Sequence, residues 1–250
     1  MSKMNMWNFK KVLKKASVNY LIPGVSLEFD GDKIIANSIS SDNNTIAFLS
    51  LPNEVTEDKS EQYEFNFSDI ATNLKPYIDL VKDESVNVKV EENRLVIKDS
   101  QKKRFNLFFC TKDFTNHFSG KDSSDKLNFF YDSKMSESLL EKINEIKKVA
   151  FKFGKIYFIA EEGKLYVETT DKTNSFCNSV RVEVDELNDS DINISMCFDF
   201  KNLSYILSTI DDNITDFSLK CTYIEQSEAG MILFENSDKS EKYFITSKIE

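Results

Sequence analysis

Four lysines near the N-terminus form the part of the sequence best suited to bind a ligand. Residues 8–16 read NFKKVLKKA, with Lys10, Lys11, Lys14 and Lys15 and no acid, in a chain of formal net charge -10. In a helix this spacing places all four ammonium groups on one stripe and the apolar residues on the opposite face. The stripe is therefore a candidate surface for the phosphates of nucleic acid. The alternative is an ordinary solvated lysine face on a surface helix.

The sequence offers little material for catalysis. His117 is the single histidine, so a Ser-His-Asp triad or a multi-histidine metal site has almost nothing to build on. The six glycines form neither a GxGxxG fingerprint nor a GxxxxGK phosphate loop. Acidic pairs such as Glu161-Glu162 and Asp211-Asp212 fall at predicted turns, where solvated carboxylates are favoured over a nuclease site. We therefore predict a scaffolding protein with no enzymatic activity, no cofactor and no metal.

The composition predicts a globular protein whose overall charge repels nucleic acid. Hydrophobic residues make up 40% and charged residues 30% of the 250 residues, with 42 acids against 32 bases. Any contact with DNA must therefore come from a local basic face. The sequence has no apolar stretch of the roughly 20 residues that a membrane span needs, and no signal-peptide pattern. We expect a soluble, intracellular protein with no membrane partner.

The order of predicted elements repeats along the chain. The first half contains helices at 8–16 and 68–75 and strands at 25–29, 33–38, 45–51, 63–67, 86–90, 94–98 and 105–110. The second contains helices at 136–149 and 199–210 and strands at 127–131, 155–160, 163–169, 175–184, 194–198, 217–223, 231–235 and 243–246. Pro76 is expected to end or kink the second helix near Lys75, because proline has no backbone N–H.

Short sequence matches support an internal duplication. Phe65-Asn66-Phe67 aligns with Phe198-Asp199-Phe200 at an offset of 133 (198 minus 65), and Lys33 aligns with Lys164 at 131 (164 minus 33). Small loop insertions account for the drift between offsets. The sequence thus predicts an α+β protein of two like-folded domains, each with two helices packed on antiparallel sheets. Their predicted ranges are 1–112 and 127–250, joined by a polar connector at 113–126.

The end of the chain resembles that of a known family. Residues 241–250, EKYFITSKIE, are similar to the closing strand and tail of the proliferating cell nuclear antigen (PCNA) family, which end in a KYYLAPKIE-type sequence. The run Lys10-Lys11-Val12-Leu13 resembles the first helix of that family, and the duplicated layout, connector and length also match. The helix-then-meander order resembles the sliding clamps of tailed phages equally well.

The resemblance implies a DNA sliding clamp, a polymerase processivity factor that forms a ring of six like domains around duplex DNA. Two domains per chain then require a homotrimer. Its implied partners are double-stranded DNA bound without sequence specificity, a DNA polymerase, a clamp loader and two further copies of the chain. Its implied place in the cell is at replication sites.

In this family two helices of each domain face the DNA. Applied to this sequence, the resemblance assigns the following DNA-facing residues: Lys10, Lys11, Lys14, Lys15, Lys75, Lys142, Lys147, Lys148 and Lys201. Glu141 and Glu145 share the polar face of the third helix, so we expect the first helix to carry most of the attraction.

Family clamps also join subunits edge to edge and bind partner peptides under the connector. The implied subunit interface contains Arg104, Phe105, Leu107, Phe109, Phe176, Val180 and Val182. The implied peptide pocket contains Ile39, Ile46, Phe114, Phe118, Phe244 and Ser247. Ser247 stands where the family usually has proline, so the shape of the pocket can differ here.

Two readings other than a clamp remain open from the sequence. The same two-domain fold could act as a monomeric protein-interaction scaffold that does not encircle DNA. An acidic DNA mimic or a nuclease is a third interpretation. The four lysines of the first helix separate the first two readings, because only a clamp needs them for polymerase stimulation.

Overall fold

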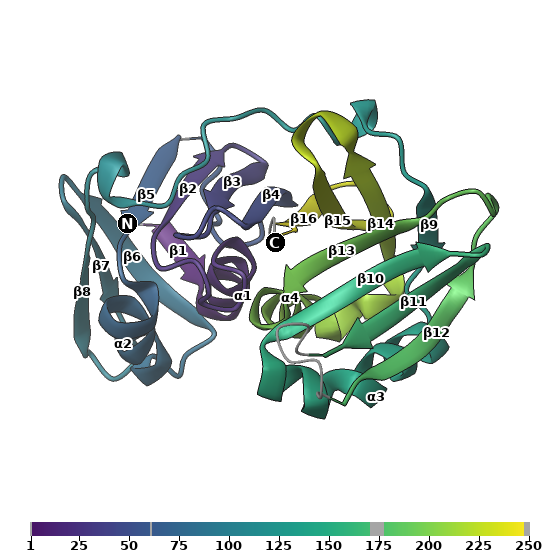
Figure 1. Cartoon of the computed structure of the whole chain (residues 1–250). Coiled ribbons are helices and arrows are strands. Elements are labelled where there is room, and N and C mark those ends of the chain that lie inside the picture. The colour runs from purple at the N-terminus through teal and green to yellow at the C-terminus, as the bar shows by residue number, and fades with distance from the viewer. Residues whose placement is uncertain (1, 61, 171–177, 248–250) are drawn as a thin grey trace. The chain divides into compact units, whose positions relative to one another are not determined.

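A computed structural model describes residues 2–60, 62–170 and 178–247 of the chain. The side chains of Ser2 and Gln226 lie outside this description. The chain divides into two compact units, Met1–Lys121 and Asp122–Glu250, both drawn in Figure 1. The connector predicted at 113–126 therefore contributes residues to both units, and each unit is described by itself.

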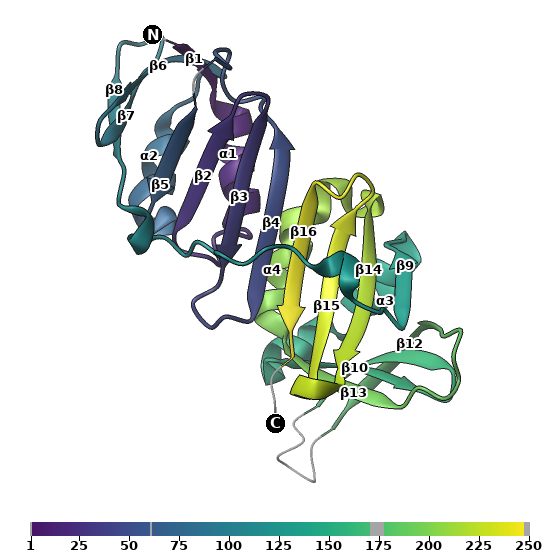
Figure 2. The same cartoon turned by 90° about the horizontal axis from the view of Figure 1, so that it is seen from above.

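The first unit contains two sets of four antiparallel strands and two helices (Figure 1). Its elements are β1 (Ser2–Asn5), α1 (Met6–Ala16), β2 (Val25–Asp30), β3 (Lys33–Ile39), β4 (Thr45–Pro52), β5 (Tyr63–Phe67), a π-helical turn (Ile70–Leu74), α2 (Lys75–Leu80), β6 (Ser85–Glu91), β7 (Arg94–Lys98) and β8 (Arg104–Phe108). The strands pair in the orders β5-β2-β3-β4 and β1-β6-β7-β8. Helix α1 packs against β2, β3 and β4, and Figure 2 shows it behind these strands.

The second unit repeats this topology element by element. It contains β9 (Tyr131–Lys134), α3 (Glu137–Phe153), β10 (Lys155–Glu161), β11 (Lys164–Thr169), β12 (Val180–Glu186), β13 (Ile194–Asp199), α4 (Phe200–Ile210), β14 (Phe217–Ile224), β15 (Ala229–Asn236) and β16 (Glu241–Thr246). Its strands pair in the orders β13-β10-β11-β12 and β9-β14-β15-β16. Lys33 and Lys164, aligned from the sequence, are the first residues of β3 and β11. The predicted α+β fold and its duplication are confirmed.

Side-chain caps fix where the helices begin. Asn5 caps α1, because its Oδ1 accepts hydrogen bonds from the backbone N–H groups of Trp7 and Asn8, each at 3.0 Å. Ser136 caps α3 through the N–H of Leu139 at 3.1 Å. Asp199 caps α4 through the N–H of Lys201 at 2.9 Å. These caps satisfy N–H groups that have no partner inside a helix.

Phenylalanines supply much of the core of each unit. In the first unit the rings of Phe29 and Phe65 have centroids 4.9 Å apart, and Phe9 from α1 meets Phe67 edge-on at 6.2 Å. In the second unit Phe158 and Phe198 form an edge-to-face pair at 5.7 Å. Burial of each such ring stabilises the folded unit by about 1.5–3 kcal/mol. These rings therefore hold the helices and strands of each unit in place.

The sequence predicts that Pro76 ends or kinks the second helix near Lys75. The helical segment does not end there, since α2 runs from Lys75 to Leu80 with Pro76 in its first turn, but it changes there from π-helical to α-helical. Proline is tolerated there because the first N–H groups of a helix have no intrahelical acceptor. A π-helical turn leads into α2 and completes a longer helical segment than predicted.

Several strands also differ from the sequence prediction, and four of them are notable. Strand β1 was missed, and the strand predicted at 127–131 is instead β9, whose Tyr131 pairs with Cys221. Strand β8 ends at Phe108, before the end predicted for it. The strand predicted at 175–184 appears as β12 from Val180 to Glu186, and residues 175–177 lie outside the described ranges.

Candidate functional site

Helix α1 forms the basic face that the sequence predicts, but its four lysines differ in exposure and in hydrogen bonding. Lys11 is exposed, and Lys14 and Lys15 are half-buried. Lys10 donates a hydrogen bond from Nζ to the backbone oxygen of Val81 at 3.0 Å, and burial lowers the pKa of its ammonium. Lys10 is therefore held by its own unit, while Lys11 and Lys14 have no ion-pair partner within the described ranges.

Lys75 and Lys142 are likewise occupied by neighbouring groups. Lys75 Nζ donates to Asp79 Oδ2 at 2.6 Å, which raises the pKa of the Lys75 ammonium and offsets its charge. Lys142 Nζ donates to the backbone oxygen of Val184 at 2.7 Å. The Lys75 pair lies within α2, whereas Lys142 ties α3 to β12, and both side chains offer less positive charge to a ligand than their residue type suggests.

The other predicted DNA-facing lysines are exposed. Lys147 and Lys148 lie on α3, and Lys201 lies in the first turn of α4 with its Nζ 5.9 Å from the centre of the Tyr205 ring. Glu141 and Glu145, also exposed on α3, reduce the net charge of that helix. The structure thus leaves α1 with a lysine face that no acid of its own helix interrupts.

An apolar patch lies under the connector in the first unit. Ile39 of β3 and Ile46 of β4 are direct register neighbours and are half-buried. Phe118 of the connector packs edge-on against Phe48 of β4, with ring centroids 5.5 Å apart. The structure therefore brings together Ile39, Ile46 and Phe118. It adds Phe48, whose outward position two residues after Ile46 was a readable signal that the sequence analysis missed.

The backbone of the connector is held between β2 and β3. Asn116 donates its N–H to Gly24 and accepts from the N–H of Ile39, and Phe118 donates to Asn37 at 2.9 Å. A Cβ on Gly24 would lie only 3.1 Å from Thr115 Cα, so glycine permits this close approach. The connector is thus fixed to the first unit by backbone hydrogen bonds.

The remaining predicted pocket residues lie apart from this patch or in the other unit. Phe114 is 73% exposed in the connector. Phe244 of β16 is buried, and Ser247 extends the pairing of that strand through two hydrogen bonds with Gly230, at 2.8 and 2.7 Å. The serine hydroxyl accepts a hydrogen bond that a proline could not accept.

A chain of charges anchors the other end of the connector to the second unit. Lys242 Nζ lies 2.6 Å from Asp122 Oδ2 and 3.2 Å from Glu235 Oε1, and it donates to Ser124 Oγ at 2.8 Å. Lys220 approaches Glu235 from the other side, at 2.8 Å. Burial acts to raise the pKa of the Glu235 carboxyl, but the two lysines outweigh it and hold that pKa below its ordinary value.

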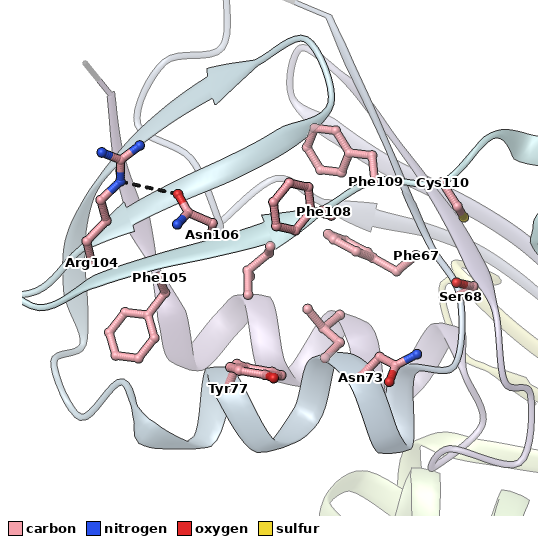
Figure 3. A pocket seen from close by; sticks show the side chains of 12 residues that line it. Phe67, Ser68, Asn73, Tyr77, Arg104, Phe105, Asn106, Phe108, Phe109 and Cys110 are labelled. Carbon is pink, nitrogen blue, oxygen red and sulfur yellow. Dashed lines mark hydrogen bonds between the residues drawn. The ribbon is translucent and has the colours of Figure 1, made fainter.

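The predicted interface residues of the first unit line a groove of about 610 Å³ between α2 and β8. Figure 3 shows Tyr77 of α2 facing Phe105 of β8 across it. Arg104 is exposed and donates from Nε to Asn106, while Leu107 is buried. Further along, Phe109 stacks on the core ring of Phe65 at 5.2 Å. Sequence reasoning missed Tyr77 and Phe108, whose side chains are 54% and 61% exposed.

Strand β12 carries the interface residues predicted in the second unit. Val180 and Val182 are half-buried on one side of the strand, which pairs with β11 alone among the described strands. Strand β8 similarly pairs with β7 alone in the described part of the chain. Both strands therefore present backbone N–H and C=O groups to a further strand. Phe176 lies outside the described residues.

Other kinds of site find no support in the described residues. Within them, no three or more His, Cys, Asp or Glu side chains gather where they could hold a metal ion. In the same ranges, no helix combines the length and apolar character needed to cross a membrane.

Comparison with known proteins places the fold. No protein-family model and no curated protein sequence matches the chain. Solved structures do match, among them three structures of PCNA proteins. PCNA of A. fulgidus, bound by the C-terminal region of FEN-1, has a TM-score of 0.65 and 14% identity over 100% of this chain and 99% of that one. The PCNA2-PCNA3 complex of Sulfolobus tokodaii gives 0.63 and 14%, with the same coverage.

The third match is PCNA of Thermococcus kodakaraensis, with a TM-score of 0.65, 14% identity and 99% coverage of both chains. In all three cases the match spans both units of this chain and essentially the whole of the other protein. The duplicated α+β topology and these full-length matches together show that the chain has the PCNA-like sliding-clamp fold.

Proposed function

We propose that this protein is a DNA sliding clamp that encircles duplex DNA as a homotrimer and tethers a DNA polymerase and other replication proteins. The observation that carries the proposal is the full-length match of both repeated units to the clamp fold. A clamp performs no reaction of its own, and a clamp loader opens it onto DNA. We place it inside the cell, at replication sites.

The electrostatics favour a ring that slides. In a chain of net charge -10, Lys11 and Lys14 give α1 exposed or half-exposed cations without acids on the same helix. Lysines attract phosphates without fixing a base sequence, so DNA is held and can still move. Lys147, Lys148 and Lys201 supply additional positive charge, whereas Lys10, Lys75 and Lys142 are partly committed to their own units.

The two edge strands have complementary ends, which supports closure of the ring through copies of the chain. The turn before β8 is basic, with Lys102, Lys103 and Arg104 all exposed. The end of β12 and the segment after it are acidic, with Glu186 and Asp189 exposed. Antiparallel pairing of β8 with β12 of a second copy sets the start of one strand beside the end of the other. Opposite charges then meet.

The patch under the connector suits a partner peptide with apolar anchors. Ile39, Ile46 and Phe48 give an apolar floor on the outer side of β3 and β4, and Phe118 closes over it from the connector. An extended peptide that buries apolar side chains here gains hydrophobic energy, and it leaves the lysine helix on the other side of the sheet free for DNA. We propose this patch as the docking site of the polymerase.

The mass in solution and retention on DNA test the proposal. A homotrimer has about three times the 28.9 kDa mass of the chain by light scattering. It should stay on a nicked DNA circle after loading and be lost when the circle is cut, whatever its sequence. A stable monomer that binds linear DNA tightly would refute the clamp. It would instead favour the monomeric scaffold.

A further inference from the structure

Trp7 lies at the N-terminal end of the lysine face of α1. On the helix it lies three, four and seven positions before Lys10, Lys11 and Lys14, the spacings that place side chains on one face. The buried residues of α1, among them Phe9 and Leu13, lie on the opposite face. The face is therefore a lysine surface that begins with an aromatic ring, and not a purely basic stripe.

The ring of Trp7 is exposed and has no aromatic or cationic partner among the described residues. Trp7 is 62% exposed, although tryptophan is the largest apolar side chain and is highly buried on average. It has no ring partner and no cation over its ring among the described residues. The helix uses the backbone of Trp7, whose N–H donates to the cap residue Asn5, and leaves the ring unengaged. An exposed ring of this kind is available to a ligand.

The chemistry of the face indicates which part of a nucleic acid meets the ring. Lysine ammonium groups pair with phosphates of either single or double strands. An indole ring gains most from stacking on the flat face of a base, and those faces are accessible only where bases are unpaired. In a duplex the bases already stack on each other. The combination of lysines with one aromatic ring thus adds affinity for single-stranded nucleic acid.

We propose that Trp7 stacks on unpaired bases, so that α1 binds single-stranded nucleic acid through base and phosphate together. The inference rests on the proposed function, in which α1 faces nucleic acid. In a clamp it gives the ring a contact with the single strand next to a primer–template junction. The lysines alone would not distinguish that strand from the duplex behind it.

The chain has a single tryptophan, so its emission reports on this site without labelling. The full-length protein is titrated at low salt with oligo(dT) and with a blunt duplex of equal phosphate number, each dye-labelled so that binding is read independently. Saturation with oligo(dT) should quench the emission, and saturation with duplex should leave it nearly unchanged. An unchanged emission on saturation with oligo(dT) overturns the proposal.

Substitutions separate stacking from charge. Trp7→Leu should weaken oligo(dT) binding at least about five-fold, the lower end for one base–aromatic stack, and leave duplex binding unchanged. Trp7→Phe should restore part of the loss. Lys11→Gln should weaken both ligands together. Phe114→Leu, at an exposed ring of the connector and on no helix that carries a predicted DNA-facing lysine, is the matched control and should change neither. Equal weakening of both ligands by Trp7→Leu refutes stacking.

Measuring retention on nicked circles with the same wild-type sample tests the clamp proposal independently of the Trp7 proposal. A protein that is retained as a trimer but shows no quenching disproves only the role of Trp7. A monomer that escapes the circle yet is quenched by oligo(dT) disproves only the clamp.

Discussion

Replacing Lys242 with methionine should destabilise the second unit, because its ammonium is the buried centre of a charge chain. The side chain is only 6% exposed, and it lies within 3.2 Å of both Asp122 and Glu235. Methionine keeps an apolar stem of similar length but removes the charge and the hydrogen bond to Ser124. The variant therefore isolates the electrostatic contribution from packing.

The expected loss of unfolding free energy in Lys242→Met depends on the contacts that Asp122 and Glu235 retain in the variant. Breaking a buried ion pair by removing one member costs about 3–5 kcal/mol. Glu235 retains Lys220 at 2.8 Å, and the side chain of Asp122 is 29% exposed and can be hydrated. We therefore expect the lower end, about 3 kcal/mol. For a protein of this size it corresponds to a fall in Tm of about 6–12 °C.

Lys239 provides the matched control. It also joins the second unit to the connector, through Asp125 at 3.2 Å, but its side chain is 57% exposed and that of Asp125 is 76% exposed. Exposed pairs contribute about 0–1 kcal/mol, so Lys239→Met should change the unfolding free energy little. Both variants are compared by urea unfolding. Equal small losses for Lys242→Met and Lys239→Met would refute the reasoning.

The same chain predicts a pH dependence with a definite sign. The pKa of the Glu235 carboxyl is lowered in the folded unit, so its stabilisation is present above its unfolded value and is lost as pH falls through the folded value. The pKa of the Lys242 ammonium is raised, because hydrogen bonds to Asp122 and Glu235 outweigh its burial. Its stabilisation is lost as pH rises through that value. Lys242→Met should flatten both ends of a stability–pH profile measured by thermal unfolding.

Three further predictions test the other surfaces. Lys11→Glu with Lys14→Glu should abolish stimulation of the polymerase and lower the salt dependence of duplex binding, while Lys33→Glu on an exposed strand end should not. Arg104→Glu should shift the mass in light scattering from trimer toward monomer, because it places an acid opposite the acidic end of β12 of a second copy. An unchanged mass would contradict the pairing of β8 with β12. Gly24→Ala should cost about 1–3 kcal/mol in urea unfolding, since the new methyl group would press on Thr115, and an unchanged midpoint would show that the connector yields.

The candidate DNA-facing lysines could be identified from the sequence, but not which of their ammonium groups are already bound within the folded unit. Lys10, Lys11 and Lys14 look equivalent in the run NFKKVLKKA, yet Lys10 donates to Val81, 71 residues away. Similarly, Lys142 is held by Val184. Such partners are brought close only by the folded chain, so local spacing cannot reveal which cation remains available to a ligand. Trp7 could have been placed on the lysine face from spacing alone, but its exposure required the packed unit.

The sequence by itself determined the duplicated order of helices and strands. The reason is that hydrophobic periodicity and helix caps such as Ser136 and Asp199 are local properties. The tertiary structure determined the features that depend on contacts between segments distant in sequence, which hydrophobic periodicity cannot predict. Pro76 is accommodated in the first turn of α2, and the connector is fixed because Gly24, directly before β2, and Ile39 of β3 offer their backbone groups to Asn116. The charge chain on Lys242 likewise needs the folded unit, since Asp122 is 120 residues away in sequence and Glu235 lies opposite Lys242 on the neighbouring strand β15.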